Sequence, residues 1–225
     1  MGLLSSFSQD DSTRVANIPD YVSAKPYSIF AVFDFELTGL NGDVDQIIEP
    51  AIVLCNENGQ PLFAWETLID PGRDTGPVHI HKITNEMVAN APKFEEVAPD
   101  LIELFNGRVI VGLNNSLDFQ CLKRELDVLG VRFHQGDSLD LSALFRDAMF
   151  TDLYEDEIME AINSQEEEHR AMPDTMVAVA VLPLALQFAR DHPERVKQYT
   201  QCKIVVHDRE PLSRQIEGIG FMAPG

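Results

Sequence analysis

Hydrophobic positions in the first third of the chain occur as three strand-like runs. Residues 27–35 form a nearly continuous aromatic and β-branched run, typical of a strand covered on both faces, and we expect it at the centre of a sheet. Residues 47–55 and 62–69 predict two further strands, and the Asn, Gly and Pro of segment 56–61 favour a hairpin turn between them. The strand over 62–69 is a candidate edge strand and dimer contact, with a monomer as the alternative.

Helical and strand patterns alternate after these runs. A short helix is predicted over 84–88, and apolar residues recur at helical spacing over 94–105. Residues 108–113 predict a buried strand, and residues 116–129 predict a helix that Gly130 stops. Three leading strands followed by alternating strands and helices predict a mixed α/β sheet.

The last predicted helix runs from Pro173 to about Arg190 and is mostly apolar. Proline is favoured at the first helical position, so we expect Pro173 there, and we expect Pro183 to kink the helix. Before it, residues 152–168 hold eight acidic and no basic residues, which is typical of a solvated helix or a mobile segment. A solvated helix is the preferred interpretation, and a mobile lid is the alternative.

Charge narrows the function classes. The 225 residues include 17 Lys plus Arg and 37 Asp plus Glu, a formal net charge of −20. This excess argues against tight, metal-free binding of nucleic acid, but not against an enzyme that holds phosphates through bound metal ions. Three Cys without a Cys-x-x-Cys pair favour a reducing, cytoplasmic compartment. We find no apolar run approaching the roughly 18 residues of a membrane span, so no membrane partner is expected.

Paired carboxylates stand at the end of the first predicted strand. If the strand continues past Phe35, then Asp34 and Glu36 project from the same face. Two adjacent carboxylates in a poorly solvated place repel each other, and a shared proton or a bound cation relieves the repulsion. The alternative is an acidic pair at a strand end beside water.

Two later segments carry matching chemistry. Asn114 and Asp118 follow a buried strand, where helix capping is the simpler explanation. His169 and Asp174 would lie roughly 140° apart on one helix, but a helix that begins between them leaves His169 in the preceding loop, free to fold over the first turn. Each segment is unremarkable alone, whereas together they predict a shared site.

The three motifs resemble those of the DEDDh branch of 3′–5′ exonucleases. The family's Asp-x-Glu with Thr-Gly, its Asn before an Asp, and its His-x4-Asp are matched, in that order, by Asp34, Glu36, Thr38 and Gly39, by Asn114 and Asp118, and by His169 and Asp174. Linker motifs over 70–73 and 80–84 also match, and the resemblance extends from about residue 28 to about residue 190. Within the family, the epsilon-type proofreading exonucleases of DNA polymerase III are the most similar.

The resemblance implies a ribonuclease H-like fold, a mixed five-stranded sheet flanked by helices. The exonuclease domain would span 27–202, between an N-terminal arm over 1–26 and a C-terminal strand or tail over 203–225. The implied activity is release of nucleoside 5′-monophosphates from single-stranded or frayed 3′ ends of DNA, in proofreading or repair, with a DNA polymerase subunit as a candidate partner. The alternatives are an RNA or oligoribonucleotide exonuclease and, ranked lower, a catalytically silent polymerase-associated scaffold.

The resemblance also implies two divalent ions, Mg²⁺ or Mn²⁺. Asp34, Glu36 and Asp174 would hold the ion that activates water, Asp34 and Asp118 would hold the ion at the leaving group, and His169 would be the general base. Substrate-binding positions by the same resemblance are the backbone of Leu37, Thr38 and Gly39, the base wedges Leu40 and Ile83, and Asn114. For Leu40 and Ile83, ordinary core residues are the alternative.

Overall fold

The computed structural model describes residues 30–131, 138–163 and 170–195. The predicted arm over 1–26 and the tail over 203–225 lie outside these ranges. The elements are, in chain order, β1 (Phe30–Leu37), β2 (Ile47–Cys55), β3 (Pro61–Glu66), α2 (Val78–His81), α3 (Asn85–Val88), α4 (Phe94–Phe105), β4 (Val109–Gly112), α5 (Ser116–Val128), β5 (Ser138–Asp140), the 3₁₀ helix η3 (Leu141–Arg146), α6 (Ala148–Asn163) and α7 (Ala171–Asp191).

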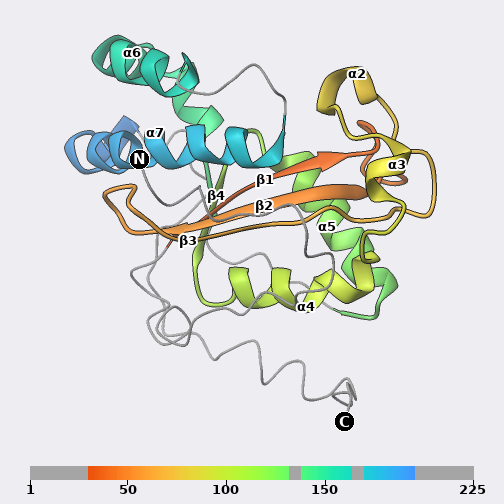
Figure 1. Ribbon diagram of the computed structural model, residues 1–225. Helices are drawn as coiled ribbons and strands as arrows, with labels where there is room; N and C mark the ends of the chain where they lie inside the picture. The colour runs from red at the N-terminus through yellow and green to blue at the C-terminus, as the bar shows by residue number, and fades with distance from the viewer. Residues whose placement is uncertain (1–29, 132–137, 164–169, 196–225) are drawn as a thin grey trace.

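The sheet has five strands in the order β3-β2-β1-β4-β5 (Figure 1). β2 pairs antiparallel with β1 and β3, whereas β4 pairs parallel with β1 and β5. The mixed α/β sheet, the central place of the first strand and the edge position of β3 are therefore confirmed.

Side chains of β1 alternate between two cores, because successive residues of a strand point to opposite faces. Ala31, Phe33 and Phe35 join a cluster with residues of α4 and α5, whereas Val32 packs with residues of α6 and α7. In Figure 1, α6 and α7 cover one face of the sheet and α4 lies beneath the other. Asp34 and Glu36 share the parity of Val32, so the strand directs both carboxylates to the face that α7 covers.

Several predicted boundaries need correction. The helix expected from Pro173 begins at Ala171, and Pro173 is its third residue. The first four N–H groups of a helix have no partner within it, so a proline in the third position removes no bond. The helix also continues through Pro183 without interruption. The strand expected to reach residue 69 ends at Glu66.

Helix α7 is apolar because it is a core helix. Its 21 residues are long and apolar enough, by composition alone, to cross a membrane, which our sequence reading did not recognise. Its contacts with β1, β2 and α6 account for this composition, since the inward side chains belong to the core on that face of the sheet.

Candidate active site

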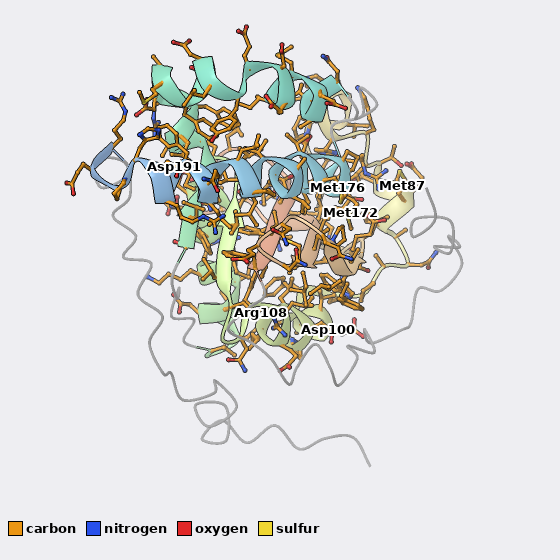
Figure 2. The ribbon with its side chains drawn as sticks, turned by 90° about the vertical axis from the view of Figure 1, so that its left-hand side faces the viewer. Met87, Asp100, Arg108, Met172, Met176 and Asp191 are labelled. Carbon is orange, nitrogen blue, oxygen red and sulfur yellow. The ribbon has the colours of Figure 1, made fainter. Side chains whose placement is uncertain are left out.

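Three carboxylates from two elements converge at the end of β1. Asp34 and Glu36 come from β1, and Asp174 comes from the first turn of α7. One oxygen from each lies within 4.8 Å of the others. Figure 2 labels Met172 and Met176, which mark this end of α7, and Met87 of α3 lies on the same side of the molecule in that view. The sheet and the helix thus bring together residues about 140 positions apart in the chain.

Burial and repulsion between neighbouring charges oppose the ionisation of Asp34 and Glu36. Burial is the main cause that raises the pKa of Asp34 well above its usual value, and the charges of Asp118 and Asp174 raise it further. Burial also raises the pKa of Glu36 to about 7, with Asp174 as the largest charge contribution. The cluster therefore favours either bound protons or a bound cation.

Asp118 lies close by but outside the tight group of three. It belongs to the first turn of α5, is 8% exposed, and burial raises its pKa to about 7. Its charge contributes to the raised pKa of both Asp34 and Glu36, so the four carboxylates share one electrostatic environment.

The end of β5 supports the segment before Asp118. Asp140 Oδ1 accepts hydrogen bonds from Asn114 N at 3.0 Å and from Ser142 N at 2.9 Å. Asn114 has a φ of 53°, a left-handed conformation that Asn tolerates. This contact fixes the backbone that leads from β4 into α5.

His169 lies outside the described residues, so the structure does not test its predicted role as general base. The described chain resumes at Arg170, whose guanidinium contacts the carboxylate of Glu49 on β2.

The segment after β1 is held in place by hydrogen bonds to Asp45. Its carboxylate accepts a hydrogen bond from Thr38 Oγ1 at 2.8 Å and another from Asn41 N at 2.9 Å. A Cβ on Gly39 would overlap the same carboxylate. Thr38 is buried, whereas Leu40 is 89% exposed at the tip. The exposed Leu40 fits the predicted base wedge, which stays a prediction.

Ile83 requires a correction. It is fully buried and packs with Ile48 and Val88, so it is a core residue. A side chain without exposed surface cannot contact a base, and the alternative stated for it from the sequence is the one that holds. The exposed apolar side chains near Ile83 in the sequence are instead Val78, Ile80 and Met87.

Gly76 lies against the backbone of Thr38, in the segment after β1, and its substitution gives a testable prediction. Its φ is +86°, and a Cβ there would overlap the carbonyl oxygen of Thr38, so Gly76→Ala is expected to displace the segment after β1. Gly130→Ala is the matched control, because its φ is +76° with nothing within 4 Å. Both variants carry the backbone strain of about 1–3 kcal/mol. Thermal unfolding and a 3′-end cleavage assay should show that only Gly76→Ala also loses activity, and equal effects would contradict this prediction.

Sequence reasoning missed Glu49, Asp45 and Asp140, the three acidic residues that support the site. Glu49 could have been identified from the sequence, because it interrupts an otherwise apolar strand. Buried acidic residues are almost always paired, so its position indicates a buried ion pair. Asp45 and Asp140 stand in loops or at strand ends, where acidic residues are common, so the sequence alone offered no comparable signal.

The donor set fits a divalent metal ion. Three carboxylates offer hard oxygen ligands, the type that Mg²⁺ and Mn²⁺ prefer, and within the described ranges no His or Cys joins the group. The raised pKa values of Asp34 and Glu36 indicate that the surrounding protein groups alone do not compensate the charges of these two carboxylates.

Comparison with known proteins gives consistent matches. The family model described as Exonuclease (RNase_T) matches residues 31–182. The chain is 31% identical over 166 residues to a DNA polymerase III PolC-type protein of Thermotoga petrophila, covering 72% of this chain and 12% of that protein. It is 36% identical over 101 residues to the DNA polymerase III subunit epsilon of Treponema pallidum, covering 44% of this chain and 46% of that one. The chain therefore spans less than half the length of either relative.

Solved structures agree on the fold. A zinc-ion-bound E. coli ExoI–ssDNA complex matches with a TM-score of 0.63 and 16% identity, covering 76% of this chain and 42% of that one. An exonuclease I from Methylocaldum szegediense matches with a TM-score of 0.57 and 20% identity, covering 74% and 41%. At these identities the likeness shows the ribonuclease H-like exonuclease fold.

Proposed function

Because the chain belongs to the RNase_T exonuclease family, whose model matches residues 31–182, we propose that it is a divalent-metal-dependent 3′–5′ exonuclease acting on DNA. The observation that carries the proposal is the convergence of Asp34, Glu36 and Asp174 within 4.8 Å. Phosphodiester hydrolysis requires negative charge to be stabilised on the attacking and leaving oxygens, and a carboxylate cluster of this kind provides for it by holding cations.

The residues take separate roles in the proposed reaction. Asp34, Glu36 and Asp174 would hold one ion, and Asp34 with Asp118 would hold a second. When bound, such ions supply a nucleophile at neutral pH and stabilise the leaving oxygen. His169 accepts the proton of the attacking water, since an unperturbed imidazole has a pKa of about 6.5.

The segment after β1 orients the end of the substrate. The backbone at Leu37, Thr38 and Gly39 faces the terminal nucleotide, and Asp45 keeps that backbone in place by its bonds to Thr38 and Asn41. Leu40 stacks against or wedges the last base, and Asn114 contacts the same end of the substrate. The product is a nucleoside 5′-monophosphate.

DNA is the proposed substrate because the named relatives are DNA polymerase III components and the ExoI structure holds single-stranded DNA. The proposal extends to proofreading beside a polymerase subunit in the cytoplasm, which the same relatives support. The net charge of −20 fits this setting, since it predicts weak intrinsic affinity for DNA that depends on divalent ions or on a partner.

The test uses oligonucleotides labelled at the 5′ end: single-stranded DNA, duplex DNA with a 3′ mismatch, and RNA of the same sequence. With Mg²⁺ or Mn²⁺ we expect a ladder that shortens by one nucleotide per step, faster on DNA than on RNA. Chelator should abolish the ladder, as should Asp34→Ala or His169→Ala.

Asp127→Ala is the control for these variants, because it removes an exposed carboxylate from α5 and should retain the wild-type rate. Full activity in the Asp34→Ala/His169→Ala double variant would overturn the proposal. A faster rate on RNA would keep the chemistry and move the substrate class to RNA.

A further inference from the structure

Glu49 is a charged residue inside a fully buried strand. It lies within β2, every residue of which is buried, and is 2% exposed. Arg170 Nε donates to both carboxylate oxygens of Glu49, at 2.9 and 2.8 Å, and Arg170 Nη2 donates to Oε1. The N–H of Ala171 also donates to Glu49 Oε2, at 3.1 Å. One buried carboxylate thus holds both the side chain before α7 and the first N–H of that helix.

The carboxylate cluster lies beside this contact, because β2 pairs with β1, the strand that carries Asp34 and Glu36. Across the antiparallel pair, Glu49 lies opposite Glu36, and Ala51 lies opposite Asp34. Thr175 Oγ1 lies 3.5 Å from the carbonyl oxygen of Ala51 and donates to Ala171 O at 2.7 Å. The first turn of α7 therefore sits on β2 at the two positions paired with the cluster's two β1 members.

The position of Asp174 depends on these contacts between α7 and β2 more than the positions of the other two carboxylates do. Asp34 and Glu36 share one strand, so the backbone of β1 fixes their separation. Asp174 comes from a helix on the face of the sheet, and its distance from them is set by how the start of α7 is held. Glu49 suits this task, because a carboxylate is stabilised at the positive N-terminal end of a helix and bidentate pairing with Arg fixes orientation.

We propose that Glu49 and Arg170 are positioning residues that hold the first turn of α7 on β2, and thereby keep Asp174 within metal-binding reach of Asp34 and Glu36. The proposal rests on the proposed function for the identity of the bound group, a divalent ion. It assigns neither residue a direct contact with substrate.

The test is Mn²⁺ binding to the purified full chain without DNA, measured by titration calorimetry and by the electron paramagnetic resonance signal of free Mn²⁺. Glu49→Gln keeps the size of the side chain but loses its charge and one acceptor, and we expect the Mn²⁺ dissociation constant to rise about 10-fold or more. Arg170→Lys should have a smaller effect of the same direction, because Lys lacks the two-pronged geometry. In cleavage assays, kcat at limiting Mn²⁺ should fall while KM for DNA stays within about twofold.

Asp147 supplies the matched control. Its side chain is fully buried, and Arg195 beyond the other end of α7 donates to both of its oxygens, at 2.9 and 2.8 Å. Asp147→Asn thus breaks a pair of the same chemistry beyond the opposite end of α7, away from the cluster. It should lower the melting temperature about as much as Glu49→Gln, yet leave the Mn²⁺ dissociation constant unchanged.

Wild-type Mn²⁺ affinity in Glu49→Gln would overturn the proposal, as would equal weakening in Asp147→Asn, which would indicate general loosening of the helix. If Glu49→Gln does not fold, the affinity of Arg170→Lys decides in the same way. A wild-type chain that binds Mn²⁺ but cleaves no nucleic acid would contradict the proposed function alone, because the positioning role is decided by Mn²⁺ binding.

Discussion

Asp34→Asn is expected to lower exonuclease activity by at least about 10³-fold and, at the same time, to raise the melting temperature of the metal-free protein at pH 8. Activity falls because the side chain belongs to the group of three carboxylates and is proposed to contact both ions. Stability rises because Asp34 is buried among Asp118, Asp174 and Glu36, whose charges oppose its ionisation. The neutral amide removes that repulsion with little change in shape.

The pH dependence of this stabilisation has a definite sign. The pKa of Asp34 is raised in the folded state, so the folded chain binds more protons than the unfolded chain above the usual pKa of about 4. Stability contributed by the protonated group is present below that pH and is lost as pH rises through the folded pKa. The melting temperature of Asp34→Asn should therefore exceed that of wild type by about 5 °C at pH 8 and match it near pH 4.

Calorimetric melting in chelator across this pH range, beside 3′-end cleavage with Mg²⁺, measures both effects. Asp127→Asn is the control for net charge, since it removes one exposed carboxylate and should change neither property. A metal-free Asp34→Asn protein that is less stable than wild type at pH 8 would show that the cluster is already compensated within the protein.

The sequence was sufficient for the elements whose periodicity is strong. The strand over 47–55 and the helix over 94–105 match β2 and α4 residue for residue, because each has a clear periodicity and a clear boundary, although Glu49 interrupts the apolar pattern of β2. The pairing of Asp34 and Glu36 on one face followed from the two-residue period of a strand. The short β5, at Ser138–Asp140, offered no such periodicity and was not predicted.

Long-range pairing is what the sequence could not supply. The ion pair of Glu49 with Arg170 joins positions 121 apart in the chain. No local sequence pattern indicates which basic residue pairs with a buried acidic residue. Ile83 shows a second limit. In the sequence, an isoleucine that contacts a base cannot be distinguished from one that packs in the core, and only the complete burial of Ile83 identifies it as a core residue. Pro173 shows a third limit, since a proline is equally compatible with several positions of a first helical turn.

Mn²⁺ is expected to raise the melting temperature strongly at pH 8 and hardly at all at pH 5.5. At 100 times the dissociation constant, a ligand that binds only the folded state adds about 2.7 kcal/mol, or roughly 5–10 °C for a chain of this size. Glu36 and Asp118 both have a pKa raised to about 7 in the metal-free protein, so they are ionised at pH 8 and mostly protonated at pH 5.5. Binding at the lower pH must first displace those protons.

The coupling between Mn²⁺ binding and ionisation of the carboxylates can also be measured directly, as the number of protons released. Between pH 5.5 and 7, one to two protons should leave the protein for each site filled, because the metal-bound carboxylates are ionised and the metal-free ones are not. Titration calorimetry in two buffers of different ionisation enthalpy gives that number, which should fall as the pH rises above 7 and Glu36 and Asp118 ionise without metal. Asp34→Asn, lacking a central ligand, should show neither release nor a gain in melting temperature. An equal gain for wild type at pH 5.5 and pH 8 would mean that Mn²⁺ binds elsewhere, since only a site built from carboxylates of raised pKa loses its ligands to protonation over this interval.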